Sequence, residues 1–104
     1  MQTHTEGTIE CLIKLNGLDA PRLTPEGIDA TIKKIQFYVF PGTQLTVCCV
    51  ELQNGYTVTG ESACASPENF NKEIGENIAF TNAREKIWAL EGYLLKQRLF
   101  ESKE

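Results

Sequence analysis

The C-terminal segment of the chain contains no proline after Pro67, and this absence favours one long helix. Ser66-Pro67-Glu68 is typical of a helix start, because the hydroxyl can cap the helix and proline suits its first turn. From there to about Phe100 the sequence predicts a single helix of about 30 residues, about 45–50 Å long. The other elements therefore form in the part of the chain that precedes Ser66.

The pair Asn54-Gly55 fits a two-residue type I′ turn and predicts a hairpin between strands Leu45–Leu52 and Tyr56–Ala63. With this turn Glu51 lies opposite Val58, and alternation divides the side chains between two faces. The face expected to meet the core carries Leu45, Val47, Cys49, Tyr56 and Val58. The other face carries Cys48, Val50, Leu52, Thr57, Thr59 and Glu61. A β-bulge would shift this assignment by one residue and exchange the faces.

Two short helices are predicted before the hairpin. In Thr8–Asn16 the apolar residues fall at helical spacing, and Gly17 follows where a helix cap is usually needed. Thr24-Pro25-Glu26 marks the start of a second helix of about ten residues, since threonine can cap and proline suits the first helical position. The apolar residues of this helix repeat every three or four positions and are Ile28, Ile32 and Ile35.

Aromatic and β-branched residues replace this helical pattern at Phe37-Tyr38-Val39-Phe40, which favours a strand. Pro41-Gly42 then predicts a turn, because proline fixes φ and glycine accepts a positive φ. The predicted fold class is α+β, with two short N-terminal helices, a small antiparallel β-meander and one long C-terminal helix. A length of 104 residues suits a single domain spanning residues 1–104.

The charge balance disfavours nucleic acid as a partner. The chain has 10 Lys and Arg residues against 14 Asp and Glu residues, a formal net charge of −4, the reverse of what a phosphate backbone attracts. The longest uncharged stretch, residues 35–50, is interrupted by polar residues and a proline, so no membrane-spanning helix is predicted. Residues 1–6 lack the basic start and apolar core of a secretory signal. The sequence therefore predicts a soluble intracellular protein.

No catalytic residue, metal site or cofactor is predicted. Cys64 precedes a helix start, where a thiolate can be stabilised, but the only histidine, His4, lies near the N-terminus and supplies no well-placed base. Cys48 and Cys49 are adjacent on a strand and point to opposite faces, which argues against a metal site built on them. We expect the 4 cysteines to be reduced and structural, and the protein not to be an enzyme.

The predicted C-terminal helix carries more apolar surface than a three-stranded sheet can cover. Beyond Phe80, large apolar side chains spread around most of its circumference, so the helix needs contacts on two sides. We therefore expect a homodimer through the C-terminal half of this helix, because two-fold dimers are the commonest assembly. The expected interface residues are Ile87, Trp88, Leu94, Leu95 and Leu99. The alternative is that the two N-terminal helices cover this surface within one monomer.

The most distinctive runs of the sequence lie in and after the predicted hairpin. They are Leu45-Thr46-Val47-Cys48-Cys49, the run from Asn54 to Cys64, Pro67-Glu68-Asn69-Phe70, and Ile87-Trp88-Ala89-Leu90-Glu91-Gly92-Tyr93-Leu94-Leu95. In these runs the chain resembles the small tailed-phage protein family named for gene products forty-nine and sixty-six. The family has no assigned activity, cofactor or catalytic residues. The resemblance therefore implies an accessory phage protein made in the cytoplasm of an infected bacterial host.

Together these features favour a non-enzymatic oligomeric module that binds a host protein or a small defence signal. A ligand site is expected where the hairpin meets the long helix, because polar residues cluster there in the predicted fold. The expected site residues are Tyr56, Thr59, Glu61 and Ser62, with Arg84 or Lys86 of a neighbouring chain as the expected contact for an anion. The alternatives are a purely structural or assembly role and nucleic-acid binding through Lys14, Arg22, Lys33 and Lys34.

Overall fold

The computed structural model describes residues 21–102 of the chain. In chain order the elements are helix α2 (Pro25–Ala30), strands β1 (Ile32–Val39), β2 (Leu45–Leu52) and β3 (Thr57–Ala63), a 3-10 turn (Pro67–Asn69) and helix α3 (Lys72–Ser102). The strands form one antiparallel sheet in the order β1-β2-β3, so the predicted α+β class, the β-meander and the long C-terminal helix are confirmed. The predicted helix Thr8–Asn16 lies outside the described residues, and among these one short helix, not two, precedes the sheet.

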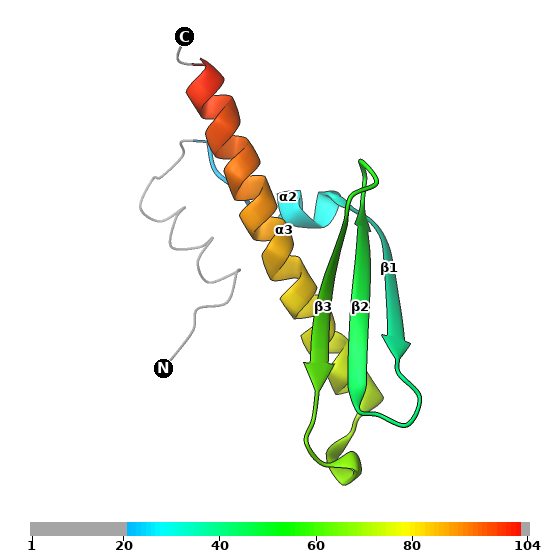
Figure 1. Ribbon diagram of the computed structural model, residues 1–104. Coiled ribbons are helices and arrows are strands. Elements are labelled where there is room, and N and C mark those ends of the chain that lie inside the picture. Colours follow the sequence, from blue (N-terminus) through cyan, green and yellow to red (C-terminus); the bar gives the residue numbers. More distant parts are fainter. Residues whose placement is uncertain (1–20, 103–104) are drawn as a thin grey trace, which may run out of the picture.

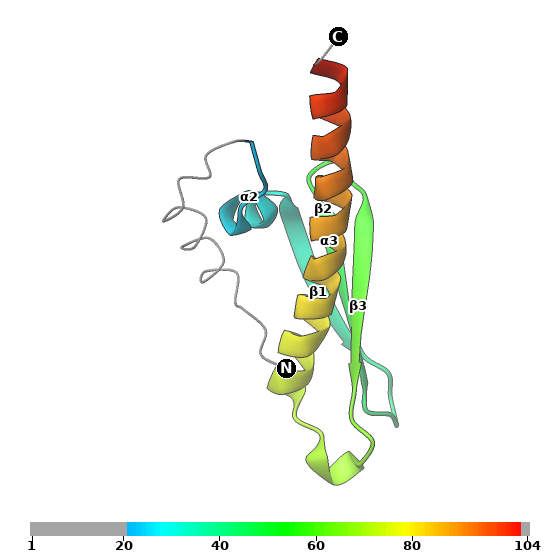
Figure 2. The ribbon, with the colours of Figure 1, turned by 90° about the vertical axis from the view of Figure 1, so that its left-hand side faces the viewer.

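Helix α3 covers one face of the sheet and packs mainly on β3 and β2 (Figure 1). Its C-terminal end continues past the tip of the β2–β3 hairpin (Figures 1 and 2). The core lies between this helix, the sheet and α2. Its buried residues are Ile28, Cys48, Val50, Leu52, Val58, Ala79, Ala83 and Ile87.

The contact between α3 and β3 depends on small residues. Gly60 lies directly under α3, and a Cβ atom on it would overlap the carbonyl oxygen of Ala79 and the amide nitrogen of Ala83. Nearer the start of α3, a Cβ atom on Gly75 would lie 3.0 Å from Oγ1 of the buried Thr46. Gly75, Ala79 and Ala83 recur at every fourth position, so they form one row along the sheet-facing side of the helix.

The hairpin is confirmed, but its predicted two-residue turn is wrong. The loop consists of Gln53, Asn54 and Gly55, because the Leu52 amide donates to the Tyr56 carbonyl at 2.8 Å. The Gly55 amide donates to the Leu52 carbonyl at 2.9 Å, and Gly55 has φ 90°. A three-residue loop that ends in a left-handed glycine is the next commonest hairpin after the two-residue type.

The extra loop residue changes the pairing, and the predicted core face is wrong as a result. Val50 pairs with Val58 and Cys48 with Gly60, one residue away from the predicted register. The core-facing residues of the hairpin are Thr46, Cys48, Val50, Leu52, Val58 and Gly60. Leu45, Val47 and Cys49 are only half-buried, on the opposite face. The face with Gly60 is the one that can accept a closely packed helix.

The second predicted helix is too long. Helix α2 ends at Ala30, where the Thr31 amide and hydroxyl both donate to the Ile28 carbonyl, at 3.1 and 2.7 Å. Ile32 and Ile35, whose spacing predicts a continuing helix, belong to β1. Strand β1 therefore starts earlier than the predicted Phe37. Its β-branched and aromatic residues suit a pleated surface, and pairing with β2 overrides the helical spacing.

The long helix is confirmed, but it starts later than the predicted Ser66-Pro67-Glu68. Residues Pro67–Asn69 form a separate 3-10 turn, and the Ser66 side chain makes no capping hydrogen bond. Asn71 caps α3, because its Oδ1 accepts a hydrogen bond from the Ile74 amide at 3.0 Å. The capping residue at the real start is thus asparagine, which is as favourable as serine at this position.

The close approach at Gly60 gives a direct test of the fold. The Gly60→Ala variant should be destabilised by about 1–3 kcal/mol or more, because the added methyl group meets helix backbone that cannot rotate away. The matched control is Thr59→Ala, the neighbouring residue on the open face, which should change stability by less than about 0.5 kcal/mol. Urea unfolding would measure both. Equal stability of the two variants would contradict this packing.

Candidate functional site

The residues predicted to form a ligand site do not come together on the sheet. Tyr56 directly precedes β3 in the hairpin and is 57% exposed. Thr59 and Glu61 lie on the open face, where the Thr59 hydroxyl is 3.5 Å from Glu61 Oε1. Ser62 lies on the side that faces α3, about 20 Å along the strand from Tyr56. These side chains therefore provide no common pocket.

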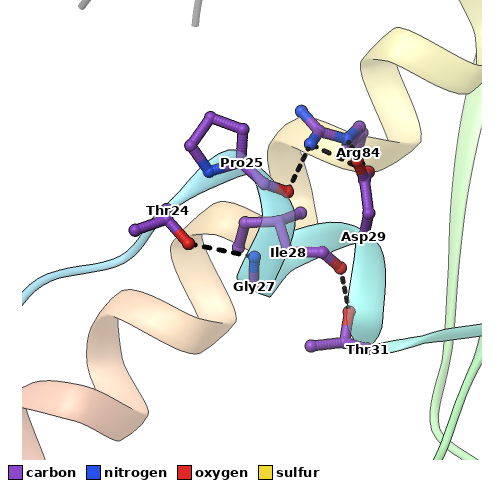
Figure 3. Close-up of polar contacts among 7 residues, drawn as sticks. All are labelled: Thr24, Pro25, Gly27, Ile28, Asp29, Thr31 and Arg84. Carbon is purple, nitrogen blue, oxygen red and sulfur yellow. Dashed lines mark hydrogen bonds and ion pairs between the residues drawn. The ribbon is translucent and has the colours of Figure 1, made fainter. Parts of the chain in front are cut away.

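Arg84, the remaining predicted site residue, joins α3 to α2 (Figure 3). Its Nε donates to Asp29 Oδ1 at 3.0 Å, and its Nη2 lies 2.9 Å from the same oxygen. Nη2 also donates to the carbonyl oxygen of Pro25 at 3.0 Å. The Arg84 side chain is 12% exposed, and its guanidinium lies 6.0 Å from the centre of the Trp88 ring. Arg84 therefore acts as a structural contact that positions α2.

The short helix α2 is built to receive this contact. Thr24 caps it, because its Oγ1 accepts a hydrogen bond from the Gly27 amide at 3.0 Å (Figure 3). Ile28 is buried on the side toward the core, which leaves Asp29 beside Arg84. Sequence reasoning missed Asp29, since the two residues are 55 positions apart and no local pattern connects them.

A small cavity lies where the sheet meets the start of α3. It has a volume of about 100 Å³, and its lining residues are Gln44, Ser62, Ala63, Cys64, Asn69, Phe70, Asn71, Ile74, Gly75 and Ile78. The Cys64 thiol donates to the Ser66 carbonyl at 3.3 Å. The lining includes no acidic, basic or histidine side chain, and the volume is well below that of a typical small-molecule site. This cavity suits a few water molecules better than a substrate.

A larger and more open groove lies at the hairpin tip. It has a volume of about 330 Å³ and is lined by Ala30, Thr31, Leu52, Gln53, Asn54, Glu91, Leu94 and Arg98. Helix α3 contributes one acidic residue, Glu91, one basic residue, Arg98, and the apolar Leu94 to this lining. The lining residues place the groove between the end of the β2–β3 hairpin and α3.

The expected interface residues divide into groups with different surroundings. Ile87 is 0% exposed and belongs to the core of the monomer. Leu94 is 37% exposed and lines the groove at the hairpin tip. Trp88, Leu95 and Leu99 are half-buried on another side of α3.

The cysteines in the described part of the chain are free, and Cys48 is fully buried. Burial raises the pKa of Cys48 from 9.0 to about 11, with further contributions from Cys49 and the Glu76 carboxylate. A thiol with this pKa stays protonated and unreactive at neutral pH. Within residues 21–102 no group of three or more His, Cys, Asp or Glu side chains is arranged to hold a metal ion.

The segment of the chain that matches a known protein family nearly coincides with the described fold. Residues 23–99 match the model of the family described as phage protein (N4 Gp49/phage Sf6 gene 66). The chain belongs to this family. The match covers α2, the sheet and nearly all of α3. No curated protein and no solved structure matches the chain. Among the described helices of this phage-family protein, none is both long and apolar enough to cross a membrane.

Substituting Arg84 and substituting Asp29 should lower the stability of the protein by different amounts. Arg84→Ala should lower the free energy of unfolding by about 1–3 kcal/mol, because the partly buried hydrogen bond to Pro25 and the packing on Trp88 are lost together with the ion pair. Asp29→Ala should cost less than about 1 kcal/mol, since the Asp29 side chain is 63% exposed. Urea unfolding of both variants measures this difference. Equal losses would mean that the ion pair dominates the contact.

The buried thiol predicts a loss of stability at high pH. In the unfolded chain Cys48 loses its proton near pH 9, whereas the folded chain retains it up to about pH 11. Between these values the unfolded state binds fewer protons, so the free energy of unfolding should fall by about 2–3 kcal/mol as the pH rises. Urea unfolding at pH 8 to 11 would measure the slope against a Cys48→Ala control. An identical slope in the control would show that other groups cause the loss.

Proposed function

We propose that this phage-family protein is a non-enzymatic binding module, which pairs with a second copy of itself and engages a component of the host bacterium. The observation that carries the proposal is an apolar face of α3 that continues beyond the sheet. Ala83, Ile87, Leu90 and Leu94 are separated by four, three and four positions and so share one side of the helix.

The side chains on this side of α3 become more exposed to solvent near the end of the sheet. Ala83 and Ile87 are 0% exposed under the sheet, whereas Leu90 and Leu94 are 39% and 37% exposed. The same side of the helix is thus covered in one half of the molecule and open in the other. A contiguous apolar surface of this kind is typical of a protein interface.

The charges beside Leu94 favour a two-fold, antiparallel pairing of two α3 helices. Glu91 and Arg98 lie on either side of Leu94 and are separated by about 10 Å along the helix axis. Neither takes part in an ion pair within the described residues. With the two-fold axis near Leu94, Glu91 of each copy would face Arg98 of the other, which gives complementary charges on both sides of the apolar contact.

Family membership supports a bacterial host as the setting, and the surface of α3 supports contact as the mode of action. The small cavity near Ser62 and the dispersed residues Tyr56, Thr59 and Glu61 offer little to a small ligand. A host protein is therefore the component that fits the proposal better than a small defence signal does.

Measuring the oligomeric state would test whether the protein pairs with a second copy of itself. The wild-type chain should have the mass of a dimer in light scattering at high concentration. Glu91→Arg should shift it to a monomer, because the introduced guanidinium would face Arg98 of the other copy and repel it. The Arg98→Glu variant should also be monomeric. An equimolar mixture of the two variants should regain the dimer mass, since opposite charges face each other again.

The mixture is the decisive arm of this experiment. Tyr93→Glu is the matched control, because Tyr93 is 75% exposed on a different side of α3 and its change should leave the dimer intact. A wild-type chain that stays monomeric, or variants that dimerise as well as the wild type, would refute the pairing. Co-purification of a host protein with the wild type but not with the monomeric variants would support the proposed contact with a host component.

A further inference from the structure

Strand β1 is an edge strand of the sheet. Within residues 21–102 it pairs with β2 alone, and residues 33–38 in its centre are all exposed. The opposite edge, at β3, is in contact with α3, because Asn82 Nδ2 donates a hydrogen bond to the carbonyl oxygen of Glu61 at 2.9 Å. The two edges therefore differ, and β1 is the one that offers its backbone to a further strand.

The hydrogen bond that follows β1 shows which of its backbone groups point outward. The Phe40 amide donates to the Leu45 carbonyl at 3.2 Å, so the backbone of Phe40 faces β2. This direction alternates along an antiparallel pair, and the register is regular from residue 34 to residue 39. The N–H and C=O groups of Ile35, Phe37 and Val39 therefore point away from β2 and form a row of donors and acceptors at the edge.

The side chains of the same residues add apolar surface beside this edge. Ile35 pairs with Val50 and Phe37 with Cys48, and both partners are buried on the side of the sheet that faces α3. Helix α3 packs mainly on β3 and β2, however, so Ile35 and Phe37 remain 41% and 39% exposed. A strand added next to β1 would bring its own alternate side chains against these two.

The N-terminal end of β1 is basic. Lys33 lies 3.7 Å from Glu51, whereas Lys34 is exposed and makes no ion pair within the described part of the chain. A second copy of β1, paired antiparallel about its centre, would place its Phe40 opposite Lys34 and bring no carboxylate there. An acidic residue on a different protein would complement this charge, which favours a partner other than a second copy.

We propose that an extended segment of the host protein adds to β1 as an antiparallel fourth strand. This segment carries apolar residues at alternate positions, which lie beside Ile35, Phe37 and Val39, and then an acidic residue, which faces Lys34 on the open side of the sheet. Main-chain hydrogen bonds supply the affinity, and the alternate side chains supply the specificity. The inference rests on the proposed contact with a host protein, and it leaves α3 available to a second copy.

Two capped, labelled peptides serve as probes of the charge preference. One is Thr-Val-Thr-Val-Thr-Val-Glu-Thr, and the other has lysine in place of glutamate. In fluorescence anisotropy the wild type should bind the acidic peptide about threefold more tightly or better, since its carboxylate faces Lys34. Lys34→Glu should reverse this preference. The matched control is Lys96→Glu, the same charge change at an exposed position of α3, which should retain it.

Two substitutions of Phe37 test the backbone contact. Phe37→Pro and Phe37→Ala both remove the ring, but only proline removes the outward N–H group. The proline variant should therefore bind the acidic peptide about tenfold more weakly than the alanine variant. Its hydrogen bonds to β2 are unaffected, so its thermal unfolding should remain cooperative. If it does not, the reversal in Lys34→Glu decides the result.

Three results would overturn the proposal. They are no binding of the acidic peptide by the wild type up to about 1 mM, no charge preference, and equal affinities of the two Phe37 variants. A fall of the dimer mass in Phe37→Pro would also overturn it, because a second copy would then occupy the edge.

Two further measurements separate this site from the rest of the proposed function. Glu91→Arg should bind the acidic peptide as well as the wild type does, so a failure of the pairing through α3 would leave this result intact. A host protein that co-purifies equally with the wild type and with Phe37→Pro would support the host contact and refute β1 as its site.

Discussion

The close contact between Gly60 and the Ala79–Ala83 turn of α3 is the interaction on which the rest of this structure depends. A strand normally holds a helix at a distance set by its side chains, but here the helix backbone lies directly on a glycine. The row Gly75, Ala79 and Ala83 allows this approach along β2 and β3. Ile87, one turn after Ala83, is the first large side chain that is fully buried on this side of α3.

That arrangement explains why apolar surface on α3 remains open. Helix α3 is longer than the sheet that supports it, so the side that is buried at Ile87 emerges at Leu90 and Leu94. On another side of α3, Gly92 lies close to Leu23, which precedes α2. The cavities near the sheet are small or shallow.

Local signals predicted the elements better than they predicted the contacts between them. The Asn54-Gly55 hairpin and the long helix followed from turn chemistry and from the absence of proline, both of which act within a few residues. The end of α2 could not be predicted from local signals, because Ile32 and Ile35 suit a helix by their spacing and a strand by their β-branched shape. Pairing with β2 made the choice. The Arg84–Asp29 contact had no sequence signal at all, since it joins elements 55 residues apart.

The sequence by itself determined the class of the fold, the order of its strands and the existence of a helix too apolar for one sheet. Tertiary structure decided which face of the hairpin is inside. One extra loop residue set Val58 beside Val50 and Gly60 beside Cys48, and only that face has the gap that α3 needs. The physical reason is that alternation along a strand is known from sequence, whereas the choice of face depends on the shape of what packs against it.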